Sequence, residues 1–283
     1  MNWPWILRFA WRDTRHSRKR LFLYLSSIIM GVAALVSIRS FGDNLVTAVE
    51  AQAKSLLGAD LQLRSSSPFE NDDEALFVEL GGDQSRMTSF ASMAFFPRRE
   101  ATRLVSVRAL TGSFPYYGRF DTEPAEAARS FQNGRYALVD ETLMMQYSAE
   151  VGEPIRIGSV TFEIAGRLRG IPGESAAVSE FSPRVYIPGQ YLEETGLVQF
   201  GSRIRYSVYF QLPSDLDVEQ LIEDRKEQLR ELELSTETVQ ERKEEFNREL
   251  RNLTLFLGLI GFVALVLGGI GVASSIHLHI RRR

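Results

Sequence analysis

Few side chains in this sequence have the types and spacing that catalysis or metal binding requires. There is no Cys, and the three histidines are His16, His277 and His279. His277 and His279 are two residues apart, so on a helix they point to different faces, and an interface pair is favoured over a metal site. The sequence contains no G-x-x-x-x-G-K-[ST], H-E-x-x-H, G-x-S-x-G or EF-hand pattern. We therefore expect no enzyme activity, no cofactor and no metal site.

Three short segments have residue types suited to binding, but each has a plainer interpretation. The acidic run Asp72–Glu74 could ligate calcium, but a solvated loop is favoured. The Gly- and Pro-containing segment Gly170–Ser175 is interpreted as a turn, with a mobile contact loop as the alternative. The segment Phe114–Gly118 places aromatic residues in a turn, where local packing is favoured over a docking surface.

Basic and aromatic residues are concentrated at the two ends of the chain. Residues 1–20 form an amphipathic pattern, with Trp3 and Leu7 on one helix face and Arg8 and Arg15 on the other. This pattern predicts a helix at the cytoplasmic membrane interface, and a positive cluster that only sets topology is the alternative. The predicted interfacial and topogenic residues are Trp3, Trp5, Trp11, Arg12, Arg15, Arg18, Lys19, Arg20, Arg281, Arg282 and Arg283. Because the protein is acidic overall and these residues adjoin a membrane, we expect no nucleic-acid partner.

Two long uncharged segments lie next to these basic ends. Leu21–Ile38 has 18 residues without a charge, and Leu253–Ile276 has 24. About 20 apolar residues cross the hydrocarbon core of a bilayer as a helix, so both are predicted to be transmembrane, the first extending to Phe41. A cleaved signal peptide is the alternative for the first segment, but it lacks an A-x-A-like cleavage site. A buried core helix is the alternative for the second.

Small residues recur four apart within both segments, a spacing that lets helix backbones approach closely. The predicted positions of membrane-helix packing are Ser27, Gly31, Gly261, Ala264, Gly268, Gly269 and Ala273. The alternative is that glycine is simply common in membrane helices. No charged residue lies within either span, so we expect no ion path or proton relay.

The distribution of charge predicts the topology. Residues 39–252 hold 24 Lys and Arg against 35 Asp and Glu, a net charge of −11, whereas both ends are basic. The positive-inside rule therefore places both termini in the cytoplasm and the central part outside. The predicted organisation is a cytoplasmic amphipathic segment (1–20), transmembrane helix 1 (21–41), an extracytoplasmic domain (42–252), transmembrane helix 2 (253–276) and a cytoplasmic basic end (277–283).

The central part is predicted to be an α+β domain with stalk helices at both ends. Apolar residues at helical spacing continue to Leu57, before Gly58, and a charged stalk at 237–252 leads into the second span. An amphipathic helix is predicted at 217–232 and a short one at 143–149. Turn residues separate segments rich in β-formers. The predicted strands are 60–64, 87–96, 103–110, 136–139, 155–157, 160–168, 184–187 and 202–212, with a hairpin turn at Gly158 and Ser159.

The arrangement resembles the permease subunits of MacB/FtsX/LolC-type ABC transporters, in which a large extracytoplasmic domain follows the first transmembrane helix and further helices follow the domain. The likeness rests on this order, on the glycine-rich second span and on short strings. These strings are Arg12–Arg15, Gly58–Leu63, Leu257–Phe262 and Gly268–Ala273, and, for a YbbP-like branch, Phe90–Ala94, Leu104–Leu110, Phe114–Gly118 and Pro183–Pro188. The resemblance implies a MacB-like periplasmic core domain followed by the start of an FtsX-like membrane unit.

The resemblance also implies partners and a place in the cell. It implies a multi-pass protein of the bacterial inner membrane that pairs with a cytoplasmic ABC ATPase subunit and with a second permease half or a second copy. Nucleotide-driven motion would pass through the helices to the outer domain, and we expect export or extraction of a hydrophobic or lipid-like substrate. Such permeases have at least four membrane helices, so we expect this sequence to be the N-terminal part of a longer permease.

Two other functions share the helix, domain, helix order. An extracytoplasmic sensor or regulator without transport activity is the main alternative, and a signalling domain after the second helix would indicate it. An enzyme anchored at the outer face is the least favoured, because the sequence shows no catalytic constellation.

Overall fold

The computed structural model describes residues 26, 29, 32–33, 36–42, 44–45, 53–171, 182–199 and 203–281. The chain divides into two compact units, residues 52–243 and residues 1–51 with 244–283. The predicted domain bounds of 42–252 lie ten residues before the start and nine residues after the end of this unit, and they stay a prediction. The first unit carries the α+β domain, and the second carries helices.

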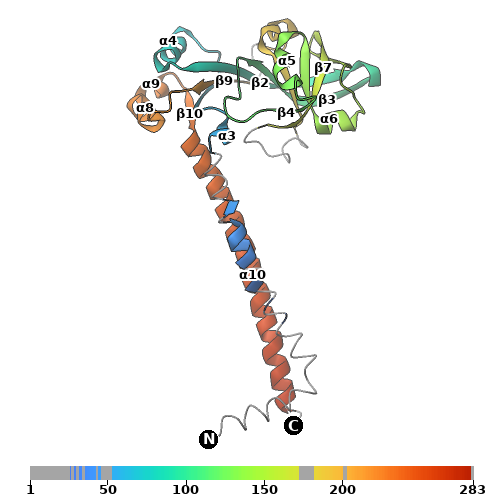
Figure 1. Cartoon of the computed structure of the whole chain (residues 1–283), viewed down its shortest axis with the longest axis vertical. Helices are drawn as coiled ribbons and strands as arrows, with labels where there is room; N and C mark the ends of the chain where they lie inside the picture. Colours follow the sequence, from blue (N-terminus) through green and yellow to red (C-terminus); the bar gives the residue numbers. More distant parts are fainter. Residues whose placement is uncertain are drawn as a thin grey trace. The chain divides into compact units, whose positions relative to one another are not determined.

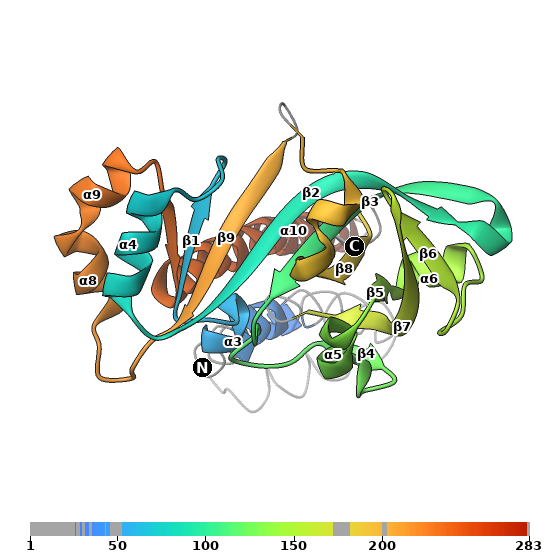
Figure 2. The ribbon, with the colours of Figure 1, turned by 90° about the horizontal axis from the view of Figure 1, so that it is seen from above.

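The domain is built on one ten-stranded mixed sheet (Figures 1 and 2). The strands are β1 (Leu61–Ser65), β2 (Asp83–Phe96), β3 (Ala101–Thr111), β4 (Asp121–Glu123), β5 (Tyr136–Asp140), β6 (Pro154–Ile157), β7 (Val160–Gly170), β8 (Arg184–Pro188), β9 (Ile204–Gln211) and β10 (Ser235–Thr238). Their order is β10-β1-β9-β2-β3-β8-β5-β7-β4, with β6 paired to β2 and β7. The pairs β3–β8 and β5–β7 are parallel, and the others are antiparallel.

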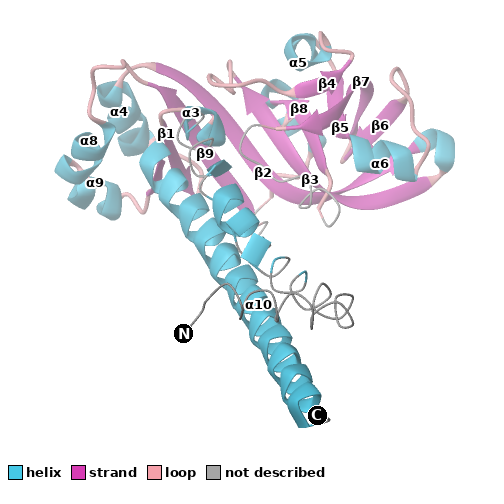
Figure 3. Ribbon diagram, turned by 60° about the horizontal axis from the view of Figure 1, so that its bottom comes forward, coloured by secondary structure: helices cyan, strands magenta, loops and turns pink. Residues whose placement is uncertain are grey.

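Helices of the domain are short and lie between the strands in sequence (Figure 3). The α-helices are α3 (Ala53–Leu57), α4 (Asn71–Leu80), α5 (Ala127–Ser130), α6 (Glu141–Gln146), α8 (Val218–Asp224) and α9 (Lys226–Glu231). The 3-10 turns are η2 (Pro97–Arg99), η3 (Phe131–Asn133), η4 (Gly189–Tyr191) and η5 (Glu193–Thr195). The long helix α10 (Val239–Arg281) begins in this unit and continues into the other.

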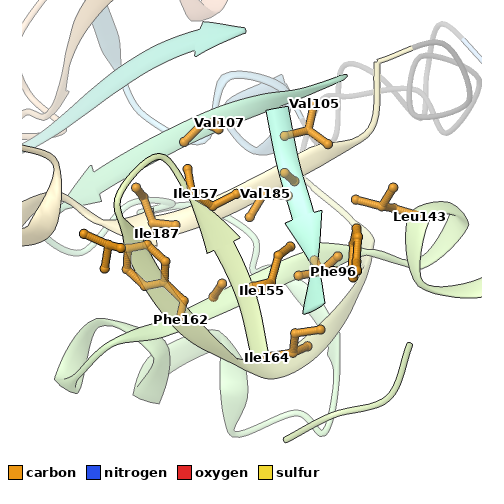
Figure 4. Close-up of a cluster of buried hydrophobic side chains, with 14 of the residues drawn as sticks. Phe96, Val105, Val107, Leu143, Ile155, Ile157, Phe162, Ile164, Val185 and Ile187 are labelled. Carbon is orange, nitrogen blue, oxygen red and sulfur yellow. The ribbon is translucent and has the colours of Figure 1, made fainter. Parts of the chain in front are cut away.

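Six strands of the sheet close on themselves in a ring. The pairings run from β2 to β3, β8, β5, β7 and β6, and β6 returns to β2, where Ala94 lies opposite Ile157. Buried aliphatic and aromatic side chains gather between these strands, among them Phe96, Val107 and Ile164 (Figure 4). The ring is therefore a filled core, and strands β6 and β7 alternate between this core and the outside.

The other half of the sheet, β10, β1, β9 and the first part of β2, is open. Its apolar face is covered by α4, α8 and α9, whose side chains, Phe77 of α4 among them, pack over Leu63 and Phe210 in a second buried cluster. The Phe77 ring meets Phe210 edge to face, with centroids 5.8 Å apart. Burial of such large side chains is the main stabilising contribution to this half of the domain.

Eight of the ten strands coincide with the predicted segments to within a few residues. The hairpin at Gly158 is confirmed: β6 and β7 pair antiparallel, and Gly158 has φ +58°. A side chain at Gly158 would collide with the carbonyl oxygen of Thr195, so glycine is required there for space as well as for conformation. Strands β4 and β10 were not predicted, because neither has an apolar alternation of its own.

Three predicted segments need correction. The acidic run Asp72–Glu74 is the first turn of α4, not a loop, because negative side chains stabilise a helix N-terminus and Asp73 accepts the Glu70 N–H at 2.7 Å. The single helix predicted at 217–232 is broken at Arg225, where φ is −111°, and both halves then contact the same apolar cluster. The stalk helix predicted at 237–252 begins at Val239, two residues later than predicted, because Glu237 and Thr238 belong to β10.

The unit of residues 1–51 and 244–283 contains most of α10, whose 43 residues make it about 65 Å long. Among the described residues, one helix segment, Val239–Ile270, is long and apolar enough to cross a membrane on length and composition alone, and none of its apolar window is buried. The first predicted span lies largely outside the described residues. Of the two predicted spans, the structure therefore shows one candidate helix, which contains most of the second span. Gly42 is helical and faces Thr254: a Cβ at Gly42 would lie 3.0 Å from the Thr254 Oγ1.

Candidate functional site

The helices α3 and α10 are attached to two neighbouring strands at the same end of the sheet. Three residues, 58–60, lie between the end of α3 and the start of β1, and α10 begins directly after β10. These strands pair antiparallel, with Leu61 opposite Thr238 and Gln62 opposite Glu237. Opposite Cα atoms in such a pair lie about 5 Å apart, so both helix attachments meet at one point of the domain. We call the residues around this pair, 54–64, 114–117, 209–212 and 237–242, the junction.

The turn from α3 into β1 depends on Gly58. Its φ is +74°, and its N–H donates to the Lys54 carbonyl at 3.0 Å, which ends the helix. A Cβ at Gly58 would lie 3.0 Å from the Phe114 ring and 3.1 Å from Pro115. Both the conformation and the close contact therefore exclude larger side chains.

Asp60 joins three parts of the junction. Its carboxylate is buried and accepts hydrogen bonds from the Lys54 Nζ at 2.8 Å, the Tyr117 hydroxyl at 2.7 Å and the Leu212 N–H at 3.0 Å. These donors come from α3, the aromatic turn and the end of β9. Three donors compensate the desolvation of a buried carboxylate, so Asp60 stabilises the junction only when all of them are present.

The ionisable neighbours of Asp60 respond to it. The hydrogen bond to the Asp60 carboxylate raises the pKa of Lys54, whose ammonium also lies 4.9 Å from the centre of the Tyr117 ring. Burial raises the pKa of Tyr117, and its hydrogen bond to Asp60 adds to the rise. Lys54 is therefore cationic and Tyr117 neutral around pH 7, as the contacts require.

Glu237 is the corresponding carboxylate on the α10 side. It is 9% exposed, pairs with Arg64 of β1 and lies 3.2 Å from the Arg242 Nη1 in the first turn of α10. The ion pairs thus connect strand β1, strand β10 and helix α10. Buried pairs of this kind fix geometry more than they add stability, because desolvation offsets much of the attraction.

Thr238 and Glu241 form a reciprocal cap at the start of α10. The Glu241 N–H donates to the Thr238 Oγ1 at 3.2 Å, and the Thr238 N–H donates to the Glu241 carboxylate at 3.0 Å. This capping box satisfies two backbone donors and fixes the direction in which the helix leaves the strand. The strand therefore passes into α10 without an intervening loop.

The chemistry of the junction is mechanical. Its ionised groups are paired, and no group of three or more His, Cys, Asp or Glu suited to a metal ion occurs in the part of the chain that the structure describes. What the arrangement can do is transmit displacement between the helices and the edge of the sheet, because Asp60 links α3 to the aromatic turn and to the end of β9, while the Glu237 ion pairs and the Thr238 cap link α10 to β10 and, through Arg64, to β1.

The site residues predicted from sequence are mostly untested. Ser27, Gly31, the three tryptophans, the basic residues of 1–20, Arg282 and Arg283 lie outside the described residues, and Arg281 ends α10. Gly261, Ala264, Gly268, Gly269 and Ala273 all lie on α10, and a Cβ at Gly269 would meet no atom within 4 Å. Their role in helix packing stays a prediction. The close approach at Gly42 was not predicted.

The residues of the junction were missed as a site, although two of the family-like strings, Gly58–Leu63 and Phe114–Gly118, lie largely within it. Gly58–Leu63 and Phe114–Gly118 contact each other: the Gly58 carbonyl accepts the Tyr116 N–H at 2.8 Å, and Asp60 accepts the Tyr117 hydroxyl. The prediction of local packing for the aromatic turn is confirmed, since Phe114 lies 4.1 Å from Tyr209 between ring centroids. The signal in the sequence was Gly58 two residues before Asp60. The structure shows that Gly58 has a positive φ and that Asp60 is buried.

Comparison with known families decides what kind of domain this is. Residues 21–227 match the family described as the MacB-like periplasmic core domain. The chain belongs to this family. The predicted resemblance to MacB/FtsX-type permeases and the α+β fold class are thereby confirmed, and the MacB-like domain is of a kind carried by permeases in the inner membrane.

Two curated relatives are ABC permeases by name. The uncharacterized ABC transporter permease YbbP of Escherichia coli K12 is 26% identical over 205 residues, which cover 72% of this chain and 25% of YbbP. The pyoverdine export ATP-binding/permease protein PvdT of Pseudomonas putida KT2440 is 25% identical over 299 residues, 98% of this chain and 45% of PvdT. The MacB-like chain thus spans between a quarter and a half of the length of these relatives.

Solved structures give a weaker likeness. The periplasmic region of MacB from Actinobacillus actinomycetemcomitans superposes with a TM-score of 0.40 and 13% identity, covering 68% of this chain and 95% of that one. A domain of a permease protein from Porphyromonas gingivalis gives a TM-score of 0.42 and 15% identity, covering 63% and 89%.

Proposed function

We propose that this chain is the N-terminal part of an ABC-transporter permease that couples a separate cytoplasmic ATPase to work done by its periplasmic domain. Both termini lie in the cytoplasm, and α10 and the first apolar segment cross the inner membrane. The ATPase moves the membrane helices, and the helices move the sheet. A second permease half or a second copy completes the membrane unit.

The observation that carries this proposal is the attachment of α3 and α10 to the paired strands β1 and β10. A change in the spacing of two helices acts most directly on a domain when both are fixed to adjacent strands. Helix α10 follows β10 without a loop, and the turn between α3 and β1 is held by the Gly58 N–H and by Asp60. The uninterrupted 43-residue α10 supports the same function, since a continuous helix transmits force along its axis.

The substrate is hydrophobic or lipid-like and is handled at the outer face. The charge-free spans support this, because carriage of a polar solute through the bilayer requires polar or ionisable groups along the path. In this mechanism the periplasmic domain extracts the substrate from the outer face of the membrane or exports it from there.

Co-purification tests the proposal. The full permease is tagged at a terminus, expressed from its own locus and isolated from native membranes in mild detergent. We expect a stoichiometric cytoplasmic subunit that carries a G-x-x-x-x-G-K-[ST] motif and hydrolyses ATP. Recovery of a histidine kinase or another signalling protein instead, with no ATPase, would favour the sensor alternative.

A matched pair of variants tests whether α10 transmits the motion. Replacing Glu244 and Glu245 by glycine, or both by alanine, removes the same charges, but each glycine costs the helix about 1 kcal/mol more than alanine. The glycine variant should lose the nucleotide-dependent change in hydrogen exchange of β1 and β10, and the alanine variant should keep it. Equal behaviour of the two variants would contradict transmission through α10.

A further inference from the structure

One face of the sheet carries arginine and serine side chains in register across three strands. Arg205 of β9 lies opposite Ser89 of β2, and Ser89 lies opposite Arg108 of β3. Directly opposite residues point to the same side of a sheet, so these three share one face. Arg64 of β1 belongs to this face as well, because it lies opposite Ser207, two residues from Arg205. We call it the arginine face.

A groove of about 520 Å³ runs over the arginine face. It is lined by Arg64, Arg203, Arg205 and several serines, including Ser89 and Ser106. A second hollow of about 240 Å³ shares Arg64, Ser89 and Arg205 with it and extends to Arg108. Guanidinium groups and hydroxyls are donors suited to phosphate and carboxylate oxygens.

The groove is cationic, whereas residues 39–252, which contain it, are acidic overall. Five arginines line the two hollows, whereas the acids among their lining residues are Glu233 and Glu237. Glu237 forms ion pairs with Arg64 and Arg242, so the other lining arginines, Arg108, Arg203 and Arg205, stand against Glu233. Arg205 is exposed and has neither an ion pair nor a hydrogen bond within the part of the chain that the structure describes. A cationic groove in a segment of net charge −11 is complementary to an anion.

The arginine face continues into an exposed apolar patch. Ala91 lies opposite Ser106, and the next pair on the same face is Met93 and Leu104. Met93 is 49% exposed and Leu104 is 58% exposed, although the opposite face of these strands is the buried core of the ring. Leu104 is four residues from Arg108, about 13 Å along the strand. Cationic and apolar surfaces are thus adjacent on one continuous face.

We infer that the arginine face binds an amphiphile whose anionic head group, a phosphate or a carboxylate, lies against Arg205 and Arg108 while its alkyl chain lies over Met93 and Leu104. The inference rests on the proposed function, in which the substrate is lipid-like, and adds the chemistry of the head group. An anionic lipid or detergent-like molecule has both parts, whereas free phosphate has only the first.

Binding is measured on the full chain in nanodiscs of zwitterionic lipid. The chain has no Cys, so a single Ala91→Cys carries an environment-sensitive fluorophore in the groove. The probes are octyl phosphate, inorganic phosphate and octyl glucoside, and empty nanodiscs correct for partitioning. We expect octyl phosphate to bind at least about tenfold more tightly than either of the other probes, and less tightly as salt rises.

Two variants separate the two parts of the site, and each has a control on another surface. Arg205→Gln should weaken octyl phosphate about fivefold or more, and Arg103→Gln, on the other face of β3, should not. Leu104→Gln should weaken octyl phosphate but leave inorganic phosphate unchanged. Val78→Gln, at an exposed apolar position on α4, should change neither.

Equal binding of octyl phosphate and octyl glucoside would overturn the inference, as would equal effects of Arg205→Gln and Arg103→Gln. Binding of an acidic protein to this face without any octyl phosphate binding would overturn it too. The assay contains no ATP and no ATPase. A negative result therefore removes the head-group site and leaves the coupling function to be decided by co-purification.

Discussion

Leu61 and Thr238 lie directly opposite one another on paired antiparallel strands, although 177 residues separate them in the chain. Leu61 is the first residue of the strand that follows α3, and Thr238 is the last residue before α10. Their pairing places the two chain entrances of the MacB-like domain side by side. Perturbation of the contacts around this pair should therefore affect both helices together.

Replacement of Gly58 by alanine tests the turn between α3 and β1. The variant has to adopt φ +74° and place a Cβ 3.0 Å from the Phe114 ring, so we expect it to lose about 2–3 kcal/mol of stability. Gly152→Ala is the control, because φ is +87° there but a Cβ would meet nothing within 4 Å, and it should lose about 1 kcal/mol. Thermal unfolding followed by circular dichroism measures both. Equal losses would show that the Phe114 contact is unimportant.

A double-mutant cycle on Asp60 and Tyr117 tests their 2.7 Å hydrogen bond. Asp60→Asn and Tyr117→Phe should each destabilise the domain, and the double variant should lose about 1 kcal/mol less than the sum. Tyr136→Phe, at an exposed position, should change the free energy of unfolding by less than about 0.5 kcal/mol. Strict additivity at Asp60 and Tyr117 would mean that the bond contributes nothing in solution.

The ion pair of Glu74 and Arg86 gives a pH dependence of known sign. Two hydrogen bonds of 2.6 Å from Arg86 lower the pKa of Glu74 below its ordinary 4.5. A lowered folded-state pKa gives stability that is present above pH 4.5 and is lost as the pH falls through the folded-state value. Because both side chains are partly exposed, Glu74→Gln should cost only about 0.2–1 kcal/mol at pH 7. The cost should shrink in acid, and a cost that grows below pH 4.5 would contradict this assignment.

The buried pair of Asp140 and Arg184 should be more sensitive than any surface pair. The side chains are 2% and 3% exposed, 3.2 Å apart, and Asp140 also caps α6 through the Thr142 N–H at 3.1 Å. Arg184→Met leaves a buried carboxylate without its cation and should cost about 3–5 kcal/mol. Adding Asp140→Asn should recover part of that loss. A double variant that is less stable than Arg184→Met would contradict the expectation.

The regular elements of the domain could be predicted from local pattern. Strands such as β2 and β7 alternate buried and exposed residues, and turn residues bound them, so their positions follow from the sequence. The second apolar segment was predicted from its length and its lack of charged residues, and it is part of one continuous helix. These features depend on neighbours within about ten residues, which the sequence displays directly.

Pairing between distant segments could not be predicted in this way. Closure of the ring depends on Ala94 of β2 meeting Ile157 of β6, and nothing local to either strand specifies that partner. Strand β10 reads Ser-Thr-Glu-Thr and has no apolar pattern; it is a strand because β1 offers it a free edge. The junction depends on the pairing of β1 with β10, and the arginine face depends on the pairings among β1, β9, β2 and β3. Because such pairings between distant segments could not be predicted, neither was predicted as a site.

The central claim is that nucleotide moves the two helices that are fixed to β1 and β10. Spin labels at Asn44 and Asn252, both exposed, are measured by double electron–electron resonance in the full permease with its ATPase in nanodiscs. A second labelled pair at Val78 and Glu219 reports on the domain itself. We expect ATP to change the first distance distribution and to leave the second unchanged. An Asn44–Asn252 distribution that is identical with and without nucleotide, in a complex that hydrolyses ATP, would contradict this expectation.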